Sequence, residues 1–512
     1  MSTGRMIARA TLTIAFFSLL SRVLGLVRDM AIAGRFGASS ATDAYQAAFA
    51  VPSMLFAIIG GALATVVVPV FTEYAAGGER REAWRVFSGV FNFMAAVFVV
   101  LSLAGMALAP LLMRLVAPHF SADTAGLAVE LTRLMFPLLL FSGLAAIFTG
   151  LLNANNIFGV PAFSNSVNNA VIITSAVTLG VVYGIHGLAA GTVLAMACMA
   201  AVQLPPLLRA GFRFRPGFCI RHPGVQKVYH LALPVAFGLS INQLPVLINS
   251  VLASGLDMGS ISSLNYANRL IQFPLALFVL ALGTAVFPTL SAQAARNDRA
   301  ALTDTMARIL KATALGVIPA AAGLAALTTP IVALLYERGA FDARATGMTA
   351  DALLYYSAGL LGQAGVLVLS RGFYALQDTR TPVQFTAVSV LINLAASLLL
   401  VRYLQHGGLA LAASLANLTN MALLLYCLGR RLPGLLDAGM LRFTAAALAA
   451  SLLMAAASYG VSEALAGAAA GKGAAGRILQ VGCAVTAGMV LYAAPMWKLA
   501  ARQVGGAGFR NR

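Results

Sequence analysis

The sequence predicts an all-α polytopic membrane protein with about 14 transmembrane helices, arranged as two six-helix repeat lobes around a central cavity plus two C-terminal helices. The 512 residues are 60% hydrophobic and only 10% charged, whereas soluble domains carry about 25% charged residues. Apolar runs of about 20 residues, the length that crosses a bilayer, recur along the whole chain. In addition, several residue patterns repeat at one nearly constant spacing.

The apolar runs define the expected spans in chain order. They cover residues 8–34, 44–72, 86–116, 124–152, 161–183, 187–208, 228–254, 262–291, 305–335, 346–375, 383–403, 408–429, 440–460 and 477–497. Short loops separate them, and the longest loop, near residues 209–227, is basic. The four cysteines are scattered without the spacing of a metal or redox site.

The distribution of basic residues predicts the orientation. Both termini and the even-numbered loops hold twenty lysines and arginines, whereas the odd-numbered loops hold seven. Cytoplasmic loops of membrane proteins carry the excess of basic residues, so both termini are expected to be cytoplasmic. The same rule accounts for the net charge of +18 without a nucleic-acid partner.

The repeat predicts the lobes. Pro161 and Pro382 open spans five and eleven, 221 residues apart, and Gly187-Leu188-Ala189 recurs as Gly408-Leu409-Ala410 at the same offset. A unit of six spans keeps its topology when it is repeated, so an axis along the membrane normal should relate the copies. The expected domains are an N-terminal lobe over residues 1–220, a C-terminal lobe over residues 221–432, and two further helices with a cytoplasmic tail over residues 433–512.

The first span carries charges that a bilayer disfavours. Its apolar run over residues 7–26 contains Arg22, and Arg28 and Asp29 follow at once. A charge in a span costs about 2.5–3.5 kcal/mol, and such residues usually face a protein interior or a watery cavity and mark a transport path. The alternative is that helix one is short and these charges lie at its rim.

Other ionisable residues of the spans are also mainly basic. They are Asp43, Glu130, Arg133, Arg269, Arg371 and Asp378. The excess of arginine indicates an anionic substrate group, because the planar guanidinium binds phosphate oxygens in pairs. The alternatives are that Arg28–Asp29, Glu130–Arg133 and Arg371–Asp378 are structural pairs, and that Asp43 caps the second span. Asparagines between residues 153 and 169 are expected to cap helices or to join them.

No enzyme signature is evident in the sequence. The five histidines form no metal-ligand pattern, there is no nucleophile elbow, and the glycine-rich segment near Lys472 lacks the spacing and hydroxyl of a phosphate loop. We therefore expect a transporter without a cofactor, which uses a coupling ion, the membrane potential or a partner.

Three segments carry a family resemblance. Residues 21–45, 266–274 and 371–382 resemble signatures of the MurJ/MviN family of lipid II flippases, and residues 335–342 form a weaker fourth block. The similarity covers nearly the whole chain. It implies the fold of the multidrug/oligosaccharidyl-lipid/polysaccharide exporter superfamily, with the two C-terminal helices forming a groove for a polyprenyl tail.

The resemblance implies a function in peptidoglycan biosynthesis and cell shape. The expected substrate is undecaprenyl-pyrophosphate-linked peptidoglycan precursor, a polyprenyl-linked glycopeptide lipid moved from the inner to the outer leaflet of the bacterial cytoplasmic membrane. Membrane lipids and the cell-wall synthesis machinery are the other expected partners. The implied substrate-binding residues are Arg22, Arg28 and Arg269, and the implied gating or structural residues are Asp29, Asp43, Arg371 and Asp378. Many relatives carry arginine soon after the helix-two proline, where this chain has Phe56 and Ala57.

Two other functions remain open from the sequence. One is a flippase for another polyprenyl-linked glycan. The other is a cation-coupled drug exporter of the same superfamily, which would favour acidic residues in its cavity. The residue pattern favours a flippase, and it predicts that Arg22, Arg28 and Arg269 converge on one cavity.

Overall fold

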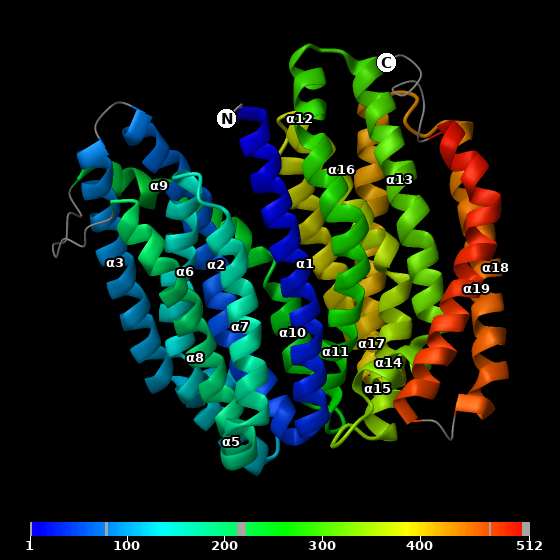
Figure 1. The fold of residues 1–512 in the computed structure, drawn as a ribbon, viewed down its shortest axis with the longest axis horizontal. Helices are drawn as coiled ribbons and strands as arrows, with labels where there is room; N and C mark the ends of the chain where they lie inside the picture. The colour runs from blue at the N-terminus through cyan, green and yellow to red at the C-terminus, as the bar shows by residue number, and fades with distance from the viewer. Residues whose placement is uncertain (1–2, 77–79, 212–221, 470–472, 504–512) are drawn as a thin grey trace. The chain divides into compact units, whose positions relative to one another are not determined.

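The structure is a computed structural model that describes residues 3–76, 80–211, 222–469 and 473–503. The described residues form helices without any strand (Figure 1). Ten helical segments of this part of the chain are long and apolar enough to cross a membrane. The expectation of an all-α polytopic membrane protein is therefore confirmed, and the count of 14 spans stays a prediction.

The chain divides into two compact units. Unit 1 comprises residues 1–261 and 338–341, and unit 2 comprises residues 262–337 and 342–512. The first ten helices of the chain lie in unit 1. They are α1 Thr3–Phe36, α2 Ser40–Ala76, α3 Arg80–Ala107, α4 Ala109–Val116, α5 Ala122–Met135, α6 Pro137–Ala154, α7 Gly159–Val177, α8 Leu179–Arg209, α9 Pro223–Ile241 and α10 Leu244–Ala253.

The remaining helices begin at the boundary between the units. They are α11 Ser260–Leu275, α12 Ala281–Ala295, α13 Arg299–Ala326, α14 Thr328–Tyr336, α15 Ala343–Ala358, α16 Leu360–Ala375, α17 Arg380–Arg431, α18 Ala438–Ala469 and α19 Gly473–Gln503. A π-helical turn, Ala276–Leu280, joins α11 to α12 directly after Pro274. Proline removes a backbone donor and a π turn widens the helix, so this span is interrupted in its middle.

The backbone repeats at the offset that the sequence shows. Gly184 in α8 (φ 59°, ψ −140°) and Gln405 in α17 (φ 48°, ψ −128°) are non-helical residues inside otherwise continuous helices, and they stand 221 residues apart. Next to each, a glycine approaches the backbone that precedes the break in the same helix: Gly187 lies against Leu179, and Gly408 lies against Leu400. Since a side chain at either glycine would overlap a carbonyl oxygen, both copies of the repeat require glycine here.

The compact units differ from the predicted lobes, since residues 338–341 belong to unit 1 and residues 433–512 belong to unit 2. The α9 and α10 segment, which the repeat assigns to the C-terminal lobe, belongs to unit 1, where α9 packs against α2 and α3. Compactness and sequence repetition are different properties, so the domain limits at residues 220 and 432 stay predictions.

Each unit has an apolar core between its helices. In unit 1, Phe98 of α3 is fully buried and its ring covers Gly143 of α6. In unit 2, Ala314 and Ile318 of α13 pack with Phe443 and Ala447 of α18. Small residues permit close approach of the helices, which is how membrane helices associate when lipid is as apolar as the protein.

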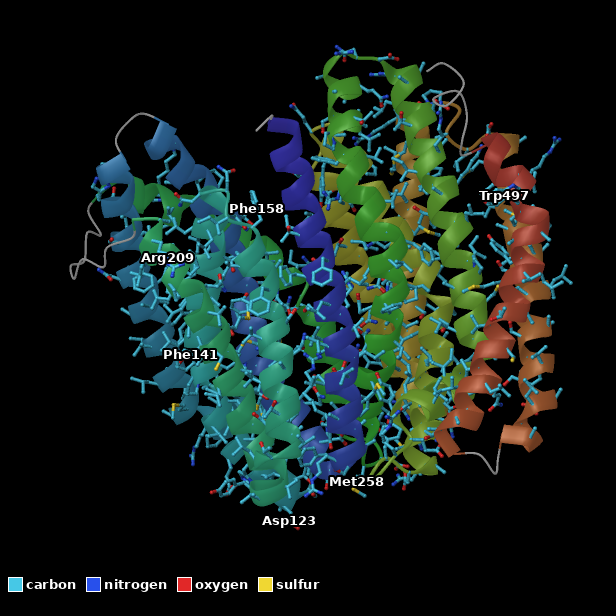
Figure 2. The ribbon with its side chains drawn as sticks, viewed as in Figure 1. Asp123, Phe141, Phe158, Arg209, Met258 and Trp497 are labelled. Atoms are coloured by element: carbon cyan, nitrogen blue, oxygen red, sulfur yellow. The ribbon has the colours of Figure 1, made fainter. Side chains whose placement is uncertain are left out.

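The ends of unit 1 alternate as the spans predict. Figure 2 shows Asp123 and Met258 at one end of this unit, and Phe158 and Arg209 toward the other end. The first two residues follow odd-numbered expected spans and the last two follow even-numbered ones, so the path of the chain through unit 1 agrees with the predicted crossings.

Candidate functional site

An arginine held in a fixed orientation lies on α1. Arg28 donates from Nε and Nη2 to Oδ1 of Asp29, at 3.0 and 2.8 Å, and from Nη1 to Oδ1 of Asn169, at 3.0 Å. Its side chain is 16% exposed and that of Asp29 is 12% exposed. A guanidinium has five N–H donors, so two remain for a ligand. The predicted Arg28–Asp29 pair is confirmed, and Arg28 keeps two N–H donors for a further acceptor.

Asn169 of α7 makes this arrangement possible. Its Nδ2 donates to the backbone oxygen and to Oγ of Ser21, at 3.0 and 3.2 Å, while its Oδ1 accepts from Arg28. Ser21 and Arg28 are seven residues apart, so they share one face of α1. The asparagine therefore joins α7 to α1, as expected of this cluster, and also orients Arg28. The sequence indicates the asparagine cluster, but no feature of it predicts that Asn169 accepts a hydrogen bond from Arg28.

Arg22 is the uncompensated cation of α1. Its side chain is exposed, and within the described residues it makes no hydrogen bond or ion pair. Because Asp29 already neutralises Arg28, the net positive charge of this part of α1 resides on Arg22. Such a charge in an apolar helix is expected only where water or an anion meets it.

The acidic residue early in α2 is not its cap. Ser39 Oγ accepts the N–H of Thr42, whereas Asp43 Oδ2 accepts the N–H of Gly259 at 2.7 Å. Asp43 is only 5% exposed. The alternative of Asp43 as the cap of the second span is therefore wrong, because its carboxylate is directed to the turn between α10 and α11.

A second turn reaches the same end of α1. The N–H of Ala340 donates to the carbonyl oxygen of Gly34 at 2.8 Å, and Phe341 is buried. Gly339 has φ 58°, and a Cβ there would overlap the oxygen of Gly34. We call Asp43, Gly259, Gly34 and the turn of residues 338–341 the α1 clamp. It explains why residues 335–342 form a recognisable block.

The third predicted arginine lies in unit 2. Arg269 is on α11, five residues before Pro274, and its side chain is exposed. It therefore stands just before the interruption of its span. Its convergence with Arg22 and Arg28 stays a prediction.

Arg371 and Asp378 do not pair with each other. The guanidinium of Arg371 lies 5.5 Å from the centre of the Phe287 ring, and Asp378 pairs with Arg431 at 2.6 Å. Asp378 also accepts hydrogen bonds from the hydroxyl and the N–H of Thr381, a residue in the first turn of α17. These hydrogen bonds lower the pKa of Asp378 to about 2, and the bond from the Thr381 hydroxyl has the largest effect. The alternative pairing Arg371–Asp378 is wrong, because the turn directs the carboxylate toward the end of α17.

The expected Glu130–Arg133 pair is absent as well. Glu130 Oε2 lies 3.1 Å from Nε2 of His186, and both side chains are largely exposed. The position where many relatives carry arginine is apolar here, since Phe56 packs against the core of unit 1. Neither position adds charge to the α1 site.

The described site can bind an anion but offers no reaction. It presents one free guanidinium and a second that keeps two donors, both on α1, which suits a phosphate or pyrophosphate group. A helical membrane protein with a repeated backbone pattern and such an anion site is typical of a membrane transporter.

Comparisons with known proteins give the family. A family model described as lipid II flippase MurJ matches residues 32–471. The chain is 34% identical over 461 residues to a lipid II flippase MurJ of Burkholderia cenocepacia, covering 87% of this chain and 88% of that protein. It is 32% identical over 436 residues to a probable lipid II flippase MurJ of Vibrio cholerae, covering 83% of each. The chain belongs to the MurJ family of lipid II flippases.

Solved structures agree with this assignment. A lipid II flippase MurJ in an inward closed conformation superposes with a TM-score of 0.80 at 26% identity, over 95% of this chain and 99% of that one. An inward-facing multidrug resistance transporter of the MATE family superposes with a TM-score of 0.70 at 12% identity, over 83% of this chain and 98% of that one. The second likeness shows the shared fold alone.

Proposed function

We propose that the protein moves lipid II, the undecaprenyl-pyrophosphate-linked peptidoglycan precursor, from the inner to the outer leaflet of the bacterial cytoplasmic membrane. The observation that carries this proposal is the arginine pair on α1. Arg22 is uncompensated and Arg28 keeps two donors in a fixed orientation. Together with membership of the family, this charge pattern favours a pyrophosphate headgroup over a cationic drug.

The binding step uses Arg22, Arg28 and Arg269. The pyrophosphate would accept hydrogen bonds from the two remaining N–H groups of Arg28 and from the guanidinium of Arg22. Arg269, the basic residue of the interrupted span, would complete the site from the second lobe. Bidentate bonds from arginine fix the orientation of phosphate as well as its charge.

The translocation step requires alternating access. The α1 clamp ties the start of α2 to the turn at Gly259 and the end of α1 to the turn of residues 338–341. We assign it the role of closing the outer side while the headgroup enters from the cytoplasmic side. Release of the Asp43 hydrogen bond and of the Ala340 hydrogen bond would then accompany opening, because the first holds α2 and the second holds α1 to turns that lie far away in the sequence.

The driving force needs no cofactor. An inside-negative potential favours outward movement of an anion by about 2.3 kcal/mol per charge per 100 mV. A coupling ion would act in the same direction by favouring return of the empty carrier. We further propose that both termini are cytoplasmic and that the protein contacts the cell-wall synthesis machinery.

A depletion experiment tests the proposed function. The chain is expressed in cells from which their own lipid II flippase is removed, and growth and lipid II externalisation are measured. Restored externalisation is expected for the wild-type chain and for an Arg402→Ala control, whose exposed arginine lies outside the proposed site. Restored externalisation of another polyprenyl-linked glycan, but not of lipid II, would favour the alternative flippase.

A further inference from the structure

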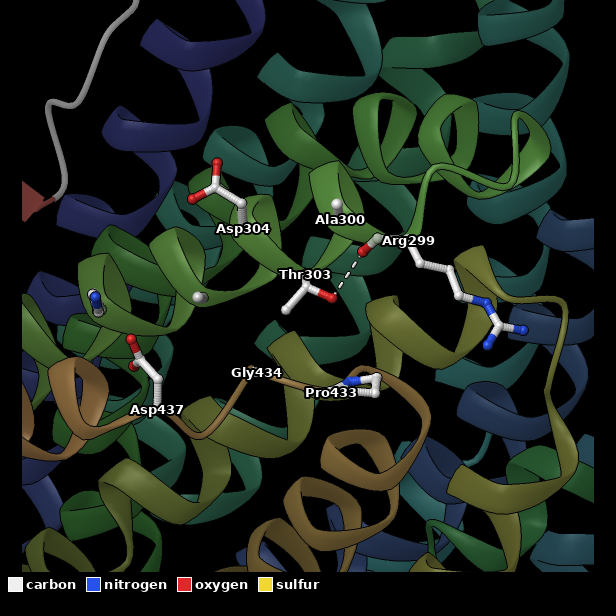
Figure 3. A pocket seen from close by; sticks show the side chains of 9 residues that line it. Arg299, Ala300, Thr303, Asp304, Pro433, Gly434 and Asp437 are labelled. Carbon is white, nitrogen blue, oxygen red and sulfur yellow. Dashed lines mark hydrogen bonds between the residues drawn. The ribbon is translucent and has the colours of Figure 1, made fainter.

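A polar pocket opens beside the first three turns of α13. It has a volume of about 560 Å³ and lies between this helix and the turn that joins α17 to α18. Figure 3 shows Thr303 and Asp304 on the α13 wall, and Pro433, Gly434 and Asp437 on the opposite wall. The α1 site has no residue in this pocket.

The position of the pocket corresponds to the surface of a membrane. Residues 299–311 of α13 carry four charged side chains, whereas residues 312–326 carry none. The same change occurs on α18, where residues 443–462 carry no charge. Since the hydrocarbon core excludes charge, Lys311 marks its boundary on α13. The pocket therefore lies at the depth of lipid headgroups.

The charges that line the pocket leave two cations available. Asp304 is neutralised by Arg308, whereas Asp437 accepts the neutral N–H of Met440 at 2.7 Å and keeps its charge, so Arg299 and Lys311 leave one excess positive charge in the pocket. Lys311 is half-buried and Arg299 is exposed. Within the described residues, neither side chain makes a hydrogen bond or an ion pair. Such cations attract an anion, and the half-buried Lys311 has the greater need of one.

An exposed apolar stripe continues from the pocket along α18. Leu441, Leu448 and Leu452 are 64%, 51% and 59% exposed. At 100° per residue they lie within about 60° of Asp437 around the helix. A molecule with its anionic group in the pocket could therefore place an acyl chain along these leucines. This combination distinguishes a lipid from a soluble phosphate.

We propose that this pocket binds the phosphodiester headgroup of an anionic membrane phospholipid, with Lys311 as the main ligand and Arg299 at the rim. Basic pockets between membrane helices on the cytoplasmic side are suited to anionic headgroups. Bound lipid would fill the space between α13 and the turn before α18, and would thereby hold α18 against α13 within unit 2. The site is separate from the arginines of the proposed transport path.

Native mass spectrometry of the full chain in detergent tests the proposal. Phosphatidylglycerol is titrated into delipidated protein, and phosphatidylcholine serves as the neutral comparison. We expect one phosphatidylglycerol to bind tightly, and Lys311→Gln to weaken its binding at least tenfold, because a hydrogen bond to a charged group contributes about 1.5–3 kcal/mol. Lys311→Arg should retain binding, and Arg299→Gln should weaken it less than Lys311→Gln does.

Matched variants and competitors decide the outcome. Arg296→Gln removes an exposed arginine three residues from Arg299 and outside the pocket, and it should bind like the wild type. Equal binding of phosphatidylcholine, an equal effect of Arg296→Gln, or displacement by inorganic phosphate or by a polyprenyl pyrophosphate would each overturn the proposal. Since Arg299 is exposed, its variant keeps the test valid if Lys311→Gln fails to fold. No flipping is required, so failure here leaves the proposed function unaffected.

Discussion

At the scale of single residues, the guanidinium groups of Arg22 and Arg28 differ in their hydrogen-bond partners. Arg22 has no partner in the described chain, whereas Arg28 is fixed by Asp29 and Asn169. The first supplies charge and the second supplies orientation. This division of roles was not evident from the sequence, because the acceptor on α7 is 141 residues from Arg28.

Replacement of Arg22 tests whether charge alone suffices. Arg22→Lys keeps the charge but loses the planar fork, so externalisation of lipid II should fall, and Arg22→Ala should reduce it further. The measurement is lipid II accessibility at the outer surface, normalised to protein abundance. Wild-type activity of Arg22→Ala at normal abundance would remove this arginine from the site.

Asn169→Ala tests the orientation of Arg28. The change removes one acceptor from Arg28 and two donors to Ser21, so stability should fall by about 1 kcal/mol. Externalisation should fall more than this loss explains. Asn169→Asp, which keeps an acceptor for Arg28, should retain more activity than Asn169→Ala. A rank order of activity that follows thermal stability alone would reduce Asn169 to a structural role.

At the scale of elements, the α1 clamp joins three segments through the Asp43 carboxylate and through backbone groups. Gly339 has a positive φ and faces Gly34 without room for a side chain. Gly339→Ala should cost about 1–2 kcal/mol for the left-handed backbone alone, in addition to the overlap. Accessibility of a cysteine placed at Ala38 to an impermeant reagent should increase. Unchanged labelling in a folded Gly339→Ala protein would contradict the clamp as a closure.

The start of α17 has a pH-dependent cap. Hydrogen bonds from Thr381 and the ion pair with Arg431 hold the pKa of Asp378 at about 2, below its unfolded value. A lowered pKa stabilises the fold above the unfolded pKa, and this contribution is lost as pH falls from about 4 toward 2. Asp378→Asn should therefore lower the Tm at pH 6, and the difference from the wild type should shrink below about pH 4. A constant difference across this range would contradict the assignment.

Much of the element order could be predicted from hydrophobic runs and glycine positions. The break at Gln405 falls between the expected spans 383–403 and 408–429, and the repeat in the sequence reappears in the backbone. Side-chain partners could not be predicted. Proximity in sequence suggests Arg371 as a partner of Asp378, whereas the fold brings Arg431 to Asp378, 53 residues away. The π turn after Pro274 left no distinctive pattern in the apolar run.

At the scale of the whole molecule, the three arginines of the predicted substrate site come from both copies of the repeat. Arg22 and Arg28 lie on the first span of one lobe, and Arg269 lies on the interrupted second span of the other. The repeat predicts that these spans surround a shared axis. Charge placed by both lobes would let a headgroup stay bound while the lobes alternate.

The predicted orientation is testable by labelling. A cysteine near Arg510 should resist an impermeant thiol reagent added to intact cells, and it should react after the membrane is opened. The excess of basic residues on one set of loops is the physical reason. Labelling from outside would contradict the predicted topology, and with it the assignment of the α1 clamp to the outer side.

The most direct test of the central claim is lipid II externalisation in cells depleted of their own flippase and supplied with this chain. We predict that the wild-type protein restores outer-leaflet lipid II and growth, and that the Arg22→Ala and Arg269→Ala variants fail at normal abundance. The contradicting result is lipid II retained in the inner leaflet although the wild-type protein is present in the membrane at the level of the flippase it replaces.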